Sequence, residues 1–293
     1  MKTITVFTPT FNRAHLLPRL YKSLLKQSNK DFIWMLIDDG SIDNTRNLVE
    51  KWISEAKIEI HYQFKENGGM HTGHNLAYAN IKTELNVCID SDDYMPKDGL
   101  EKILHRWNAI EDTSKIAGLI GLDADVHGNI IGTKIPDTLK RGALKKLYTK
   151  HKVTGDKKIV LKTEIVKQYP QYPEFPNERL VPLGVLYLMI GHDYDFIYMN
   201  EILCIVDYQV DGSSGTILKQ YKTSPKGFLY ARNIQKKYSS SFWEDLKNSI
   251  HIVSSSIFAN DMGAIFKGKK AWLNIILFPF GVFLNLYIRL MTW

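Results

Sequence analysis

Four apolar runs in the first hundred residues, each followed by polar residues, constrain the fold more than any other feature of this sequence. The runs cover residues 4–8, 32–37, 58–64 and 85–89, and the segments between them carry apolar residues at helical spacing. Short apolar runs that alternate with helical segments are typical of stacked βα units. We therefore predict an α/β fold with a mainly parallel sheet.

The polar residues after these runs would share one edge of such a sheet. They are Thr10 and Asn12, Asp38 and Asp39, Asn67, and Asp90, Asp92 and Asp93. Open parallel α/β sheets bind ligands in the crevice outside the carboxyl ends of their strands. Each group alone could make a turn or cap a helix, but four groups at one edge predict a binding site.

The rest of the chain is less regular and then becomes helical and basic. We expect further strands at 116–121, 158–161 and 196–207, a hairpin near 127–129 and a helix near 179–190. Because the pattern is helical from about residue 215, we predict one domain at 1–215 and a helical extension at 216–293.

The two cysteines and the start of the chain bear on location. Cys88 and Cys204 are too few for a disulfide framework, and both are expected as small buried strand residues in a reducing compartment. The first residues lack the long apolar core of a secretory signal. We therefore expect the body of the protein in the cytoplasm.

Asp90, Asp92 and Asp93 form the sharpest chemical feature. Three carboxylates within four residues repel one another unless a cation compensates them, and Mg²⁺ or Mn²⁺ prefers such oxygen ligands. The alternative is a set of solvated acids in a turn, with Asp93 capping the next helix. A cluster of acids directly after an apolar strand favours the metal.

Asp39 and the segment after the third run could contact other parts of a ligand. A carboxylate after a buried strand could accept a hydrogen bond from a ring N–H of a nucleobase, while Asp38 fits a turn equally well. Gly68 and Gly69 would allow the backbone to approach a ligand closely.

Segments 8–13, 38–43, 66–69 and 90–93 together resemble the motifs of one large family. They read Thr-Pro-Thr-Phe-Asn-Arg, Asp-Asp-Gly-Ser-Ile-Asp, Glu-Asn-Gly-Gly and Asp-Ser-Asp-Asp. In this order and spacing they are similar to family 2 of the inverting glycosyltransferases, which have the Rossmann-like GT-A fold. More loosely, residues 69–75 and 208–213 resemble the bacterial subgroup that builds cell-surface polysaccharides.

This resemblance implies a nucleotide-sugar donor, most often a UDP-sugar, and a role for each motif residue. Asp39 would face the uracil, and Asp90 and Asp92 match the family's Asp-x-Asp metal motif for Mn²⁺ or Mg²⁺, with Asp93 beside them. The donor-binding residues implied are Pro9, Thr10, Asn12, Arg13, Asp39, Asn67, Gly68 and Asp90.

The family also uses a carboxylate at the head of a helix as general base, and Glu178 stands at the matching position. It would take the proton from the attacking acceptor hydroxyl. The alternative is an acid favoured there by the helix dipole. His71 and His74 would lie near the diphosphate or on an exposed helix face. The chain departs from the family pattern at Met70, His74, Asn177, Arg179 and Leu183.

The net charge of +7 comes from the last quarter of the chain. Residues 216–293 contain 11 basic and three acidic residues, whereas the two signs nearly balance in 1–215. Residues 271–288 carry no charge. On a helix, a polar stripe would be formed by Lys270, Asn274, Gly281, Asn285 and Arg289.

Such a helix is suited to lie in a membrane interface with a kink at Pro279. The nearby lysines, with Lys236 and Lys237 on the same side, would add attraction to an anionic leaflet. A single membrane span and a helix buried in a homodimer are the next alternatives. Because the charge accompanies an apolar stretch and not stacking aromatics, a membrane is favoured over nucleic acid.

We therefore predict a metal-dependent inverting glycosyltransferase at the cytoplasmic face of the membrane. It would add a single sugar to a lipid-linked or other membrane-linked glycan acceptor. One alternative is a nucleotidyltransferase, which would need a Gly-rich loop after the first strand that residues 8–13 lack. The other is a non-catalytic protein that binds nucleotide sugar or scaffolds an assembly at the membrane.

Overall fold

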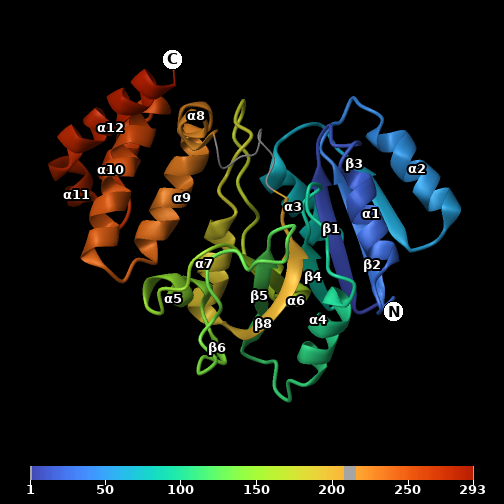
Figure 1. The fold of residues 1–293 in the computed structure, drawn as a ribbon. Coiled ribbons are helices and arrows are strands. Elements are labelled where there is room, and N and C mark those ends of the chain that lie inside the picture. Colours follow the sequence, from blue (N-terminus) through green and yellow to red (C-terminus); the bar gives the residue numbers. More distant parts are fainter. Residues whose placement is uncertain (1, 208–215, 293) are drawn as a thin grey trace. The chain divides into compact units, whose positions relative to one another are not determined.

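A computed structural model describes residues 2–207 and 216–292 (Figure 1). The chain divides into two compact units. Unit 1 comprises Met1–Pro170 with Ile190–Gln209, and unit 2 comprises Gln171–Met189 with Val210–Trp293. Compared with the predicted division after residue 215, this grouping assigns residues 171–189 to the second unit.

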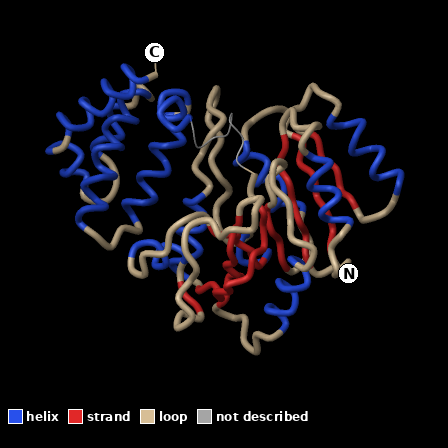
Figure 2. Tube along the Cα trace, viewed as in Figure 1, coloured by secondary structure: helices blue, strands red, loops and turns tan. Residues whose placement is uncertain are grey.

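Unit 1 is built on one mixed, mostly parallel sheet, which confirms the predicted α/β class (Figure 2). Its order is β3-β2-β1-β4-β7-β5-β8-β6. The strands are β1 Ile4–Thr10, β2 Phe32–Asp38, β3 Ile60–Phe64, β4 Leu85–Cys88, β5 Ile116–Ala124, β6 Arg141–Gly142, β7 Lys157–Lys162 and β8 Asp195–Ile205. All seven strands predicted from apolar runs are present, with ends shifted by up to three residues.

The helices of unit 1 cover this sheet and enclose its core. They are α1 Leu17–Leu25, α2 Thr45–Glu55, α3 Met70–Asn80, α4 Gly99–Asn108, α5 Leu144–Thr149 and α6 Thr163–Val166. Trp34 of β2 is fully buried and stacks with Tyr21 of α1 and Trp52 of α2. Burial of such apolar surface is the main stabilising term for the unit.

Strand direction determines which residues meet at the ligand-binding edge. β1, β2, β3 and β4 are parallel, and β7 runs antiparallel to both β4 and β5. The carboxyl ends of β4 and β5 therefore lie at the same edge as the first residues of β7. This edge collects side chains from loops that are far apart in the sequence.

Two helix boundaries differ from the prediction. The helix expected near 179–190 is α7 Gly184–Asp193, so Glu178 precedes it by a loop and not at its first turn. α4 begins after Asp98, its N-cap residue, so Asp93 does not cap the following helix. The chain between these acids and α4 instead forms a loop that pairs with β8 through Tyr94 and Ile205.

Unit 2 contains the helices α8 Ile217–Thr223, α9 Pro225–Lys237, α10 Phe242–Phe258, α11 Ala271–Ile276 and α12 Phe278–Met291, with a 3₁₀ turn at Met262–Phe266. Pro279 lies in the first turn of α12, where proline is tolerated. The uncharged segment is therefore two helices that meet at Leu277, and the predicted kink within one helix is wrong. Within residues 2–207 and 216–292, we find no helix whose length and hydrophobicity would let it cross a membrane.

The polar stripe predicted on this segment packs inward at Asn274, Gly281 and Asn285, whereas Lys270 and Arg289 are exposed. Asn274 is fully buried and Asn285 is 3% exposed, and their amides donate to the carbonyls of Ile265 and Ser254. Lys236 is also buried, at 1% exposed, and donates to Asn274 Oδ1, so its predicted contact with an anionic leaflet is wrong. Burial lowers the pKa of Lys236 to about 8, although the charge of Asp245 opposes that shift.

Candidate active site

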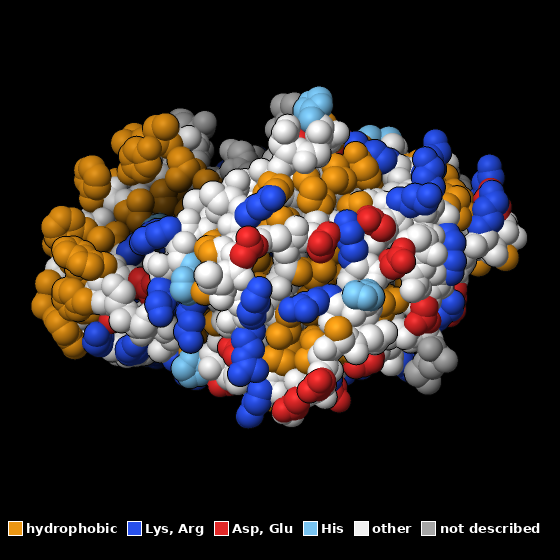
Figure 3. All heavy atoms as spheres, turned by 60° about the horizontal axis from the view of Figure 1, so that its bottom comes forward, with side chains coloured by type: hydrophobic (Ala, Val, Ile, Leu, Met, Phe, Trp, Pro, Cys, Tyr) orange, Lys and Arg blue, Asp and Glu red, His pale blue; other side chains and the backbone are white. Residues whose placement is uncertain are grey.

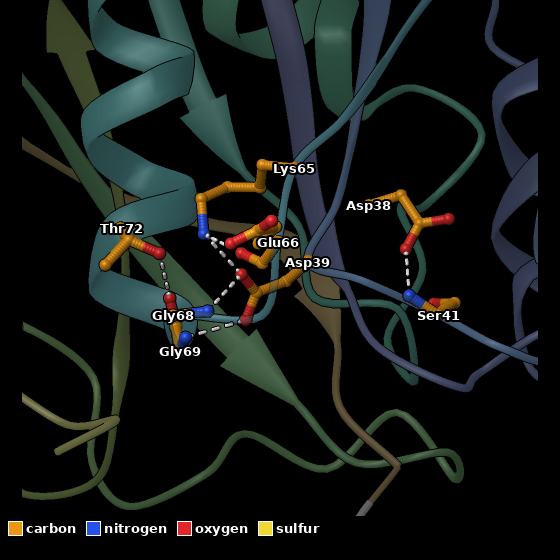
Figure 4. Close-up of polar contacts among 8 residues, drawn as sticks. All are labelled: Asp38, Asp39, Ser41, Lys65, Glu66, Gly68, Gly69 and Thr72. Atoms are coloured by element: carbon orange, nitrogen blue, oxygen red, sulfur yellow. Dashed lines mark hydrogen bonds and ion pairs between the residues drawn. The ribbon is translucent and has the colours of Figure 1, made fainter. Parts of the chain in front are cut away.

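Asp39, which directly follows β2, holds two loops together at the edge of the sheet. Its carboxylate accepts hydrogen bonds from the backbone N–H groups of Gly68 and Gly69, at 2.9 and 2.7 Å, and from Lys65 Nζ at 2.7 Å (Figure 4). The side chain is 4% exposed. Gly69 has φ 94°, a left-handed backbone conformation that favours glycine, as it caps α3. The sequence motif 66–69 is thus shaped around Asp39.

Asp38 and Asn12 support the same edge. Asp38 accepts from the Ser41 backbone N–H and the Tyr62 hydroxyl, which confirms its interpretation as a turn residue. Asn12 adopts φ 54°, and its side-chain oxygen accepts from the Ile42 backbone N–H. The loops after β1 and β2 are therefore locked to each other.

Two buried oxygens near the carboxyl ends of β1 and β3 have no hydrogen-bond partner within the described residues. They are Thr10 Oγ1, at the end of β1, and Asn67 Oδ1, beside Gly68. Buried polar atoms in native proteins are nearly always paired, and a bound ligand is one way to pair them. Thr10 is also joined to Asp39, because its carbonyl accepts from the Asp39 backbone N–H at 2.8 Å. Pro9, in the same strand, lies directly before Thr10.

The three aspartates after β4 differ in their surroundings. Asp93 is 6% exposed and turned into the protein, where it accepts from the Asp207 backbone N–H and the Cys204 thiol. Burial raises the pKa of Asp93 to about 7, and the charges of Asp90 and Asp92 add to that shift while Lys158 opposes it. Burial and the charge of Asp90 also raise the pKa of Asp92. Asp90 and Asp92 thus form a half-buried pair of acids whose mutual repulsion a bound cation would relieve.

Two arginines act on the same loop. Arg19 of α1 donates to the backbone carbonyl of Asp92 and pairs with the carboxylate of Asp207. The charges of Arg13 and Arg19 lower the pKa of Asp92, against the larger effect of burial. Arg13, predicted near the donor pocket, is therefore close enough to act on the acid pair.

Asp123 and Lys158 belong to this edge and escaped the sequence-based prediction. Asp123, at the end of β5, is 3% exposed and has an oxygen without a partner among the described residues. Burial alone would lower the pKa of Lys158, at the start of β7, but the nearby Cys204, Asp123, Asp90 and Asp93 raise it well above its ordinary value. The one available signal was an acid inside the apolar run 116–124.

His74 and Cys88 lie behind Asp90. His71 and His74 are 2% and 1% exposed, so the exposed helix face considered for them is wrong. The Cys88 sulfur is 3.7 Å from His74 Nε2 and 3.6 Å from Asp90 Oδ1. Burial lowers the pKa of His74 to about 4, so the imidazole is neutral at physiological pH. Both cysteines are free, Cys204 fully buried and Cys88 half-buried.

The donor set at this edge fits a hard divalent cation held by few protein ligands. Asp90 and Asp92 provide oxygen ligands only, and Mg²⁺ commonly uses one or two carboxylates plus substrate phosphates and water. A cage of three or more acid, histidine or cysteine ligands is not present among the residues that the structure describes.

Glu178 lies in unit 2 and caps a helix other than the one expected. Its two carboxylate oxygens accept from the backbone N–H groups of Lys226 and Gly227, at 3.0 and 2.9 Å, in the first turn of α9. A carboxylate at a helix N-terminus is favoured by the exposed N–H groups and the helix dipole. Each oxygen keeps one further lone pair.

The motif at 208–213 lies outside the described residues.

Comparison with known proteins places this arrangement in a family. The family model described as "Glycosyl transferase family 2" matches residues 5–159, more than half of the chain. The chain therefore belongs to glycosyl transferase family 2, as the four motifs predicted.

Its curated relatives are bacterial glycosyltransferases. The poly(ribitol-phosphate) β-N-acetylglucosaminyltransferase TarP of Staphylococcus aureus is 27% identical over 81% of this chain and 76% of that protein. The putative teichuronic acid biosynthesis glycosyltransferase TuaG of Bacillus subtilis is 30% identical over 34% of this chain and 40% of that protein. Matches to an uncharacterized Nostoc glycosyltransferase and to S. aureus TarS cover only 38% and 18% of those proteins.

Solved structures extend the similarity in fold over nearly the whole chain. Residues 1–349 of S. aureus TarS, in complex with UDP-GlcNAc, match 98% of this chain and 89% of that one, with a TM-score of 0.61 at 15% identity. The mannosyltransferase PcManGT of Pyrobaculum calidifontis, in complex with GDP-Man and Mn²⁺, matches 99% and 82%, with a TM-score of 0.59 at 17% identity. The chain has a GT-A-like fold.

Proposed function

We propose that this protein transfers a sugar from a UDP-sugar to a hydroxyl group of a cell-surface glycan acceptor, with inversion at the anomeric carbon. The proposal rests on the residues that the structure brings together at the carboxyl edge of the sheet. In a family 2 chain, Asp39 and the Asp90–Asp92 pair follow β2 and β4, the parallel strands on either side of β1, close to unpartnered buried oxygens.

In this proposal the nucleoside lies against the loops that follow β1 and β2. Asp39 accepts a hydrogen bond from the uracil ring N–H with a lone pair that Gly68, Gly69 and Lys65 leave open. Pro9 and Thr10 line the pocket with Asn12 and Arg13. Thr10 Oγ1 and Asn67 Oδ1 gain the partners that they lack. Solved neighbours in fold bind UDP-GlcNAc, UDP and GDP-Man, which supports a nucleotide-sugar donor.

Asp90 and Asp92 would hold Mn²⁺ or Mg²⁺, with Asp93 behind them. A bound metal supplies Lewis-acid stabilisation of the diphosphate that leaves. Lys158 limits the negative charge that Asp90, Asp93 and Asp123 accumulate at this edge. Arg19 fixes the loop through the carbonyl of Asp92.

The acceptor hydroxyl would give its proton to Glu178. The carboxylate is oriented by the N–H groups of Lys226 and Gly227, and its remaining lone pairs are free to accept a proton. The names of TarP and TuaG support a cell-wall or related surface polysaccharide as acceptor. We propose that this acceptor is linked to lipid, at the cytoplasmic face of the membrane.

Asp92→Asn tests the proposal, with Glu111→Gln as an exposed acid control in the same unit. Calorimetry with UDP-glucose, UDP-galactose and their N-acetyl forms, with and without Mn²⁺, identifies the donor. We expect Asp92→Asn to abolish the metal-dependent part of UDP-sugar binding and to lower kcat by about 10²–10³-fold. Unchanged turnover would contradict the metal assignment. Donor binding without any transfer by the parent chain would favour a non-catalytic protein instead.

A further inference from the structure

The outer surface of α11 and α12 is apolar to an unusual extent. Phe283 and Leu290 are 72% and 73% exposed. Large hydrophobic side chains gather at the left of Figure 3, where α11 and α12 lie. We call this surface the apolar face; its members are Trp272, Ile275, Ile276, Phe278, Phe280, Phe283, Leu286, Tyr287, Leu290 and Met291. Contiguous exposed apolar patches on soluble proteins mark interaction surfaces.

The inner side of the same helices combines apolar residues, Leu273 and Ile288, with polar ones. Asn274 and Asn285 point into the bundle, and Gly281 packs directly against Val253 of α10. Four serines of α10 are also buried: Ser249, Ser254, Ser255 and Ser256. The hydroxyls of Ser249, Ser254 and Ser256 have no partner within the described residues. Polar burial of this kind costs stability in a bundle that only water surrounds.

Buried polar residues beneath an exposed apolar face resemble the packing of helices in lipid. Helices in a bilayer associate through small and polar residues and present apolar side chains outward, because lipid gives no hydrophobic gain for burying them. A helix at the interface of a membrane also typically carries amphipathic aromatics such as Trp272 and Tyr287. We propose that the apolar face docks α11 and α12 into the surface of an anionic membrane, with the helices in its plane.

Charge identifies the occupant of this face as lipid and not a second copy of the chain. Residues 262–293 contain four basic residues and no acid. Lys270 is paired with Asp245, which leaves Lys267, Lys269 and Arg289 as exposed cations. A two-fold contact between two such faces would bring like charges together, whereas anionic headgroups complement them. Lys236 takes no part, since it is buried beneath α11.

The proposal deepens the proposed function, on which it rests for the location of the acceptor, but its test does not depend on transfer. Flotation of the full chain with phosphatidylcholine vesicles, with and without phosphatidylglycerol, measures docking directly. We expect binding that requires phosphatidylglycerol and weakens with salt. Phe283→Glu and Leu290→Glu should each weaken it about tenfold.

The matched control is Val126→Glu, which places the same charge on an exposed apolar residue in a turn of unit 1. It should bind vesicles like the parent chain. Quenching of Trp272 fluorescence by lipids brominated on their acyl chains, measured as the part lost in Trp272→Phe, reports insertion.

Three outcomes would overturn the proposal. The parent chain could fail to float, the two face variants could float like Val126→Glu, or light scattering could reveal a dimer that Phe283→Glu dissociates without any vesicle binding. Calorimetry with UDP-sugars on the same variants keeps this test separate from the proposed function. Docking can fail while donor binding stands, and the reverse is equally measurable.

Discussion

The two units differ in the share of polar side chains that they bury. The core of unit 1 gathers large apolar residues such as Trp34, Leu20 and Leu36. Unit 2 buries Leu229, Ile252 and Ala264 as one apolar cluster, and asparagine, serine and lysine side chains of the same helices are buried as well. Apolar residues of α11 and α12 face outward instead.

This difference teaches that the two units are adapted to different surroundings. A core such as that of unit 1 is stable in water because burial removes apolar surface from water. The exposed apolar face of unit 2 would gain stability where something apolar covers it. Our two proposals assign donor chemistry to the sheet edge and membrane attachment to the α11–α12 face.

The largest effect is expected for Glu178→Gln. This variant tests the division directly, because Glu178 belongs to unit 2 and is the proposed general base. We expect kcat to fall by about 10²–10⁴-fold while UDP-sugar binding stays unchanged. The glutamine keeps one acceptor for the N–H groups of α9, so the fold should survive.

Glu174→Gln, an exposed acid in the same loop, is the control for this measurement. Normal transfer by Glu178→Gln would move the base to another residue. Glu178 would then keep only its structural role, which is to accept hydrogen bonds from the N-terminal N–H groups of α9.

A matched pair of leucines measures the difference in packing. Leu20 of α1 is fully buried, whereas Leu290 of α12 is 73% exposed. Leu20→Ala should lower the free energy of unfolding by about 2–5 kcal/mol, and Leu290→Ala should change it by less than about 0.5 kcal/mol in detergent-free buffer. Urea unfolding followed by circular dichroism is the measurement. A large loss for Leu290→Ala would mean that its surface is part of a core.

The smallest expected effect is a pH dependence within unit 2. Burial lowers the pKa of His251 to about 3, and the charges of Arg232 and Lys247 add to the shift. Below about pH 6.5 the unfolded chain therefore binds a proton that the folded chain excludes, so the stability falls as the pH falls from about 6.5 toward 3. His251 also stacks on Tyr221, a contact that phenylalanine can keep.

We expect His251→Phe to raise the free energy of unfolding by about 1 kcal/mol at pH 5 relative to the parent chain, and to leave it unchanged at pH 7.5. Urea unfolding at the two pH values checks this, with His127→Phe in an exposed turn as control. An equal gain at both pH values would show that packing and not protonation is responsible.

Much of unit 1 follows from the sequence, because its strands are short apolar runs with polar ends. The edge that carries Thr10, Asp39 and Asp90 could be predicted since parallel strands place their carboxyl ends together. Asp123 and Lys158 could not, because their position depends on β7 running antiparallel between β4 and β5. No local pattern in the sequence specifies that pairing.

The same limit explains the corrections in unit 2. The spacing of Asn274, Gly281 and Asn285 gave the correct stripe, but helical periodicity does not state whether a stripe faces water or a neighbouring helix. Only the packing on α10 decides that. Glu178 illustrates a similar point, since its partners on α9 lie about 50 residues further along the chain.

Because β7 runs antiparallel between β4 and β5, its register determines whether Lys158 lies near Asp90, Asp93 and Asp123. Lys158 lies opposite Gly121, and its neighbour Lys157 instead donates to the carbonyls of Thr154 and Gly155. A slip of one residue would exchange Lys158 for Ile159, since alternate residues of a strand face opposite sides. The aspartates would then lose their built-in counterion, so insertions or deletions near β7 should disturb the chemistry even where every acidic residue is retained.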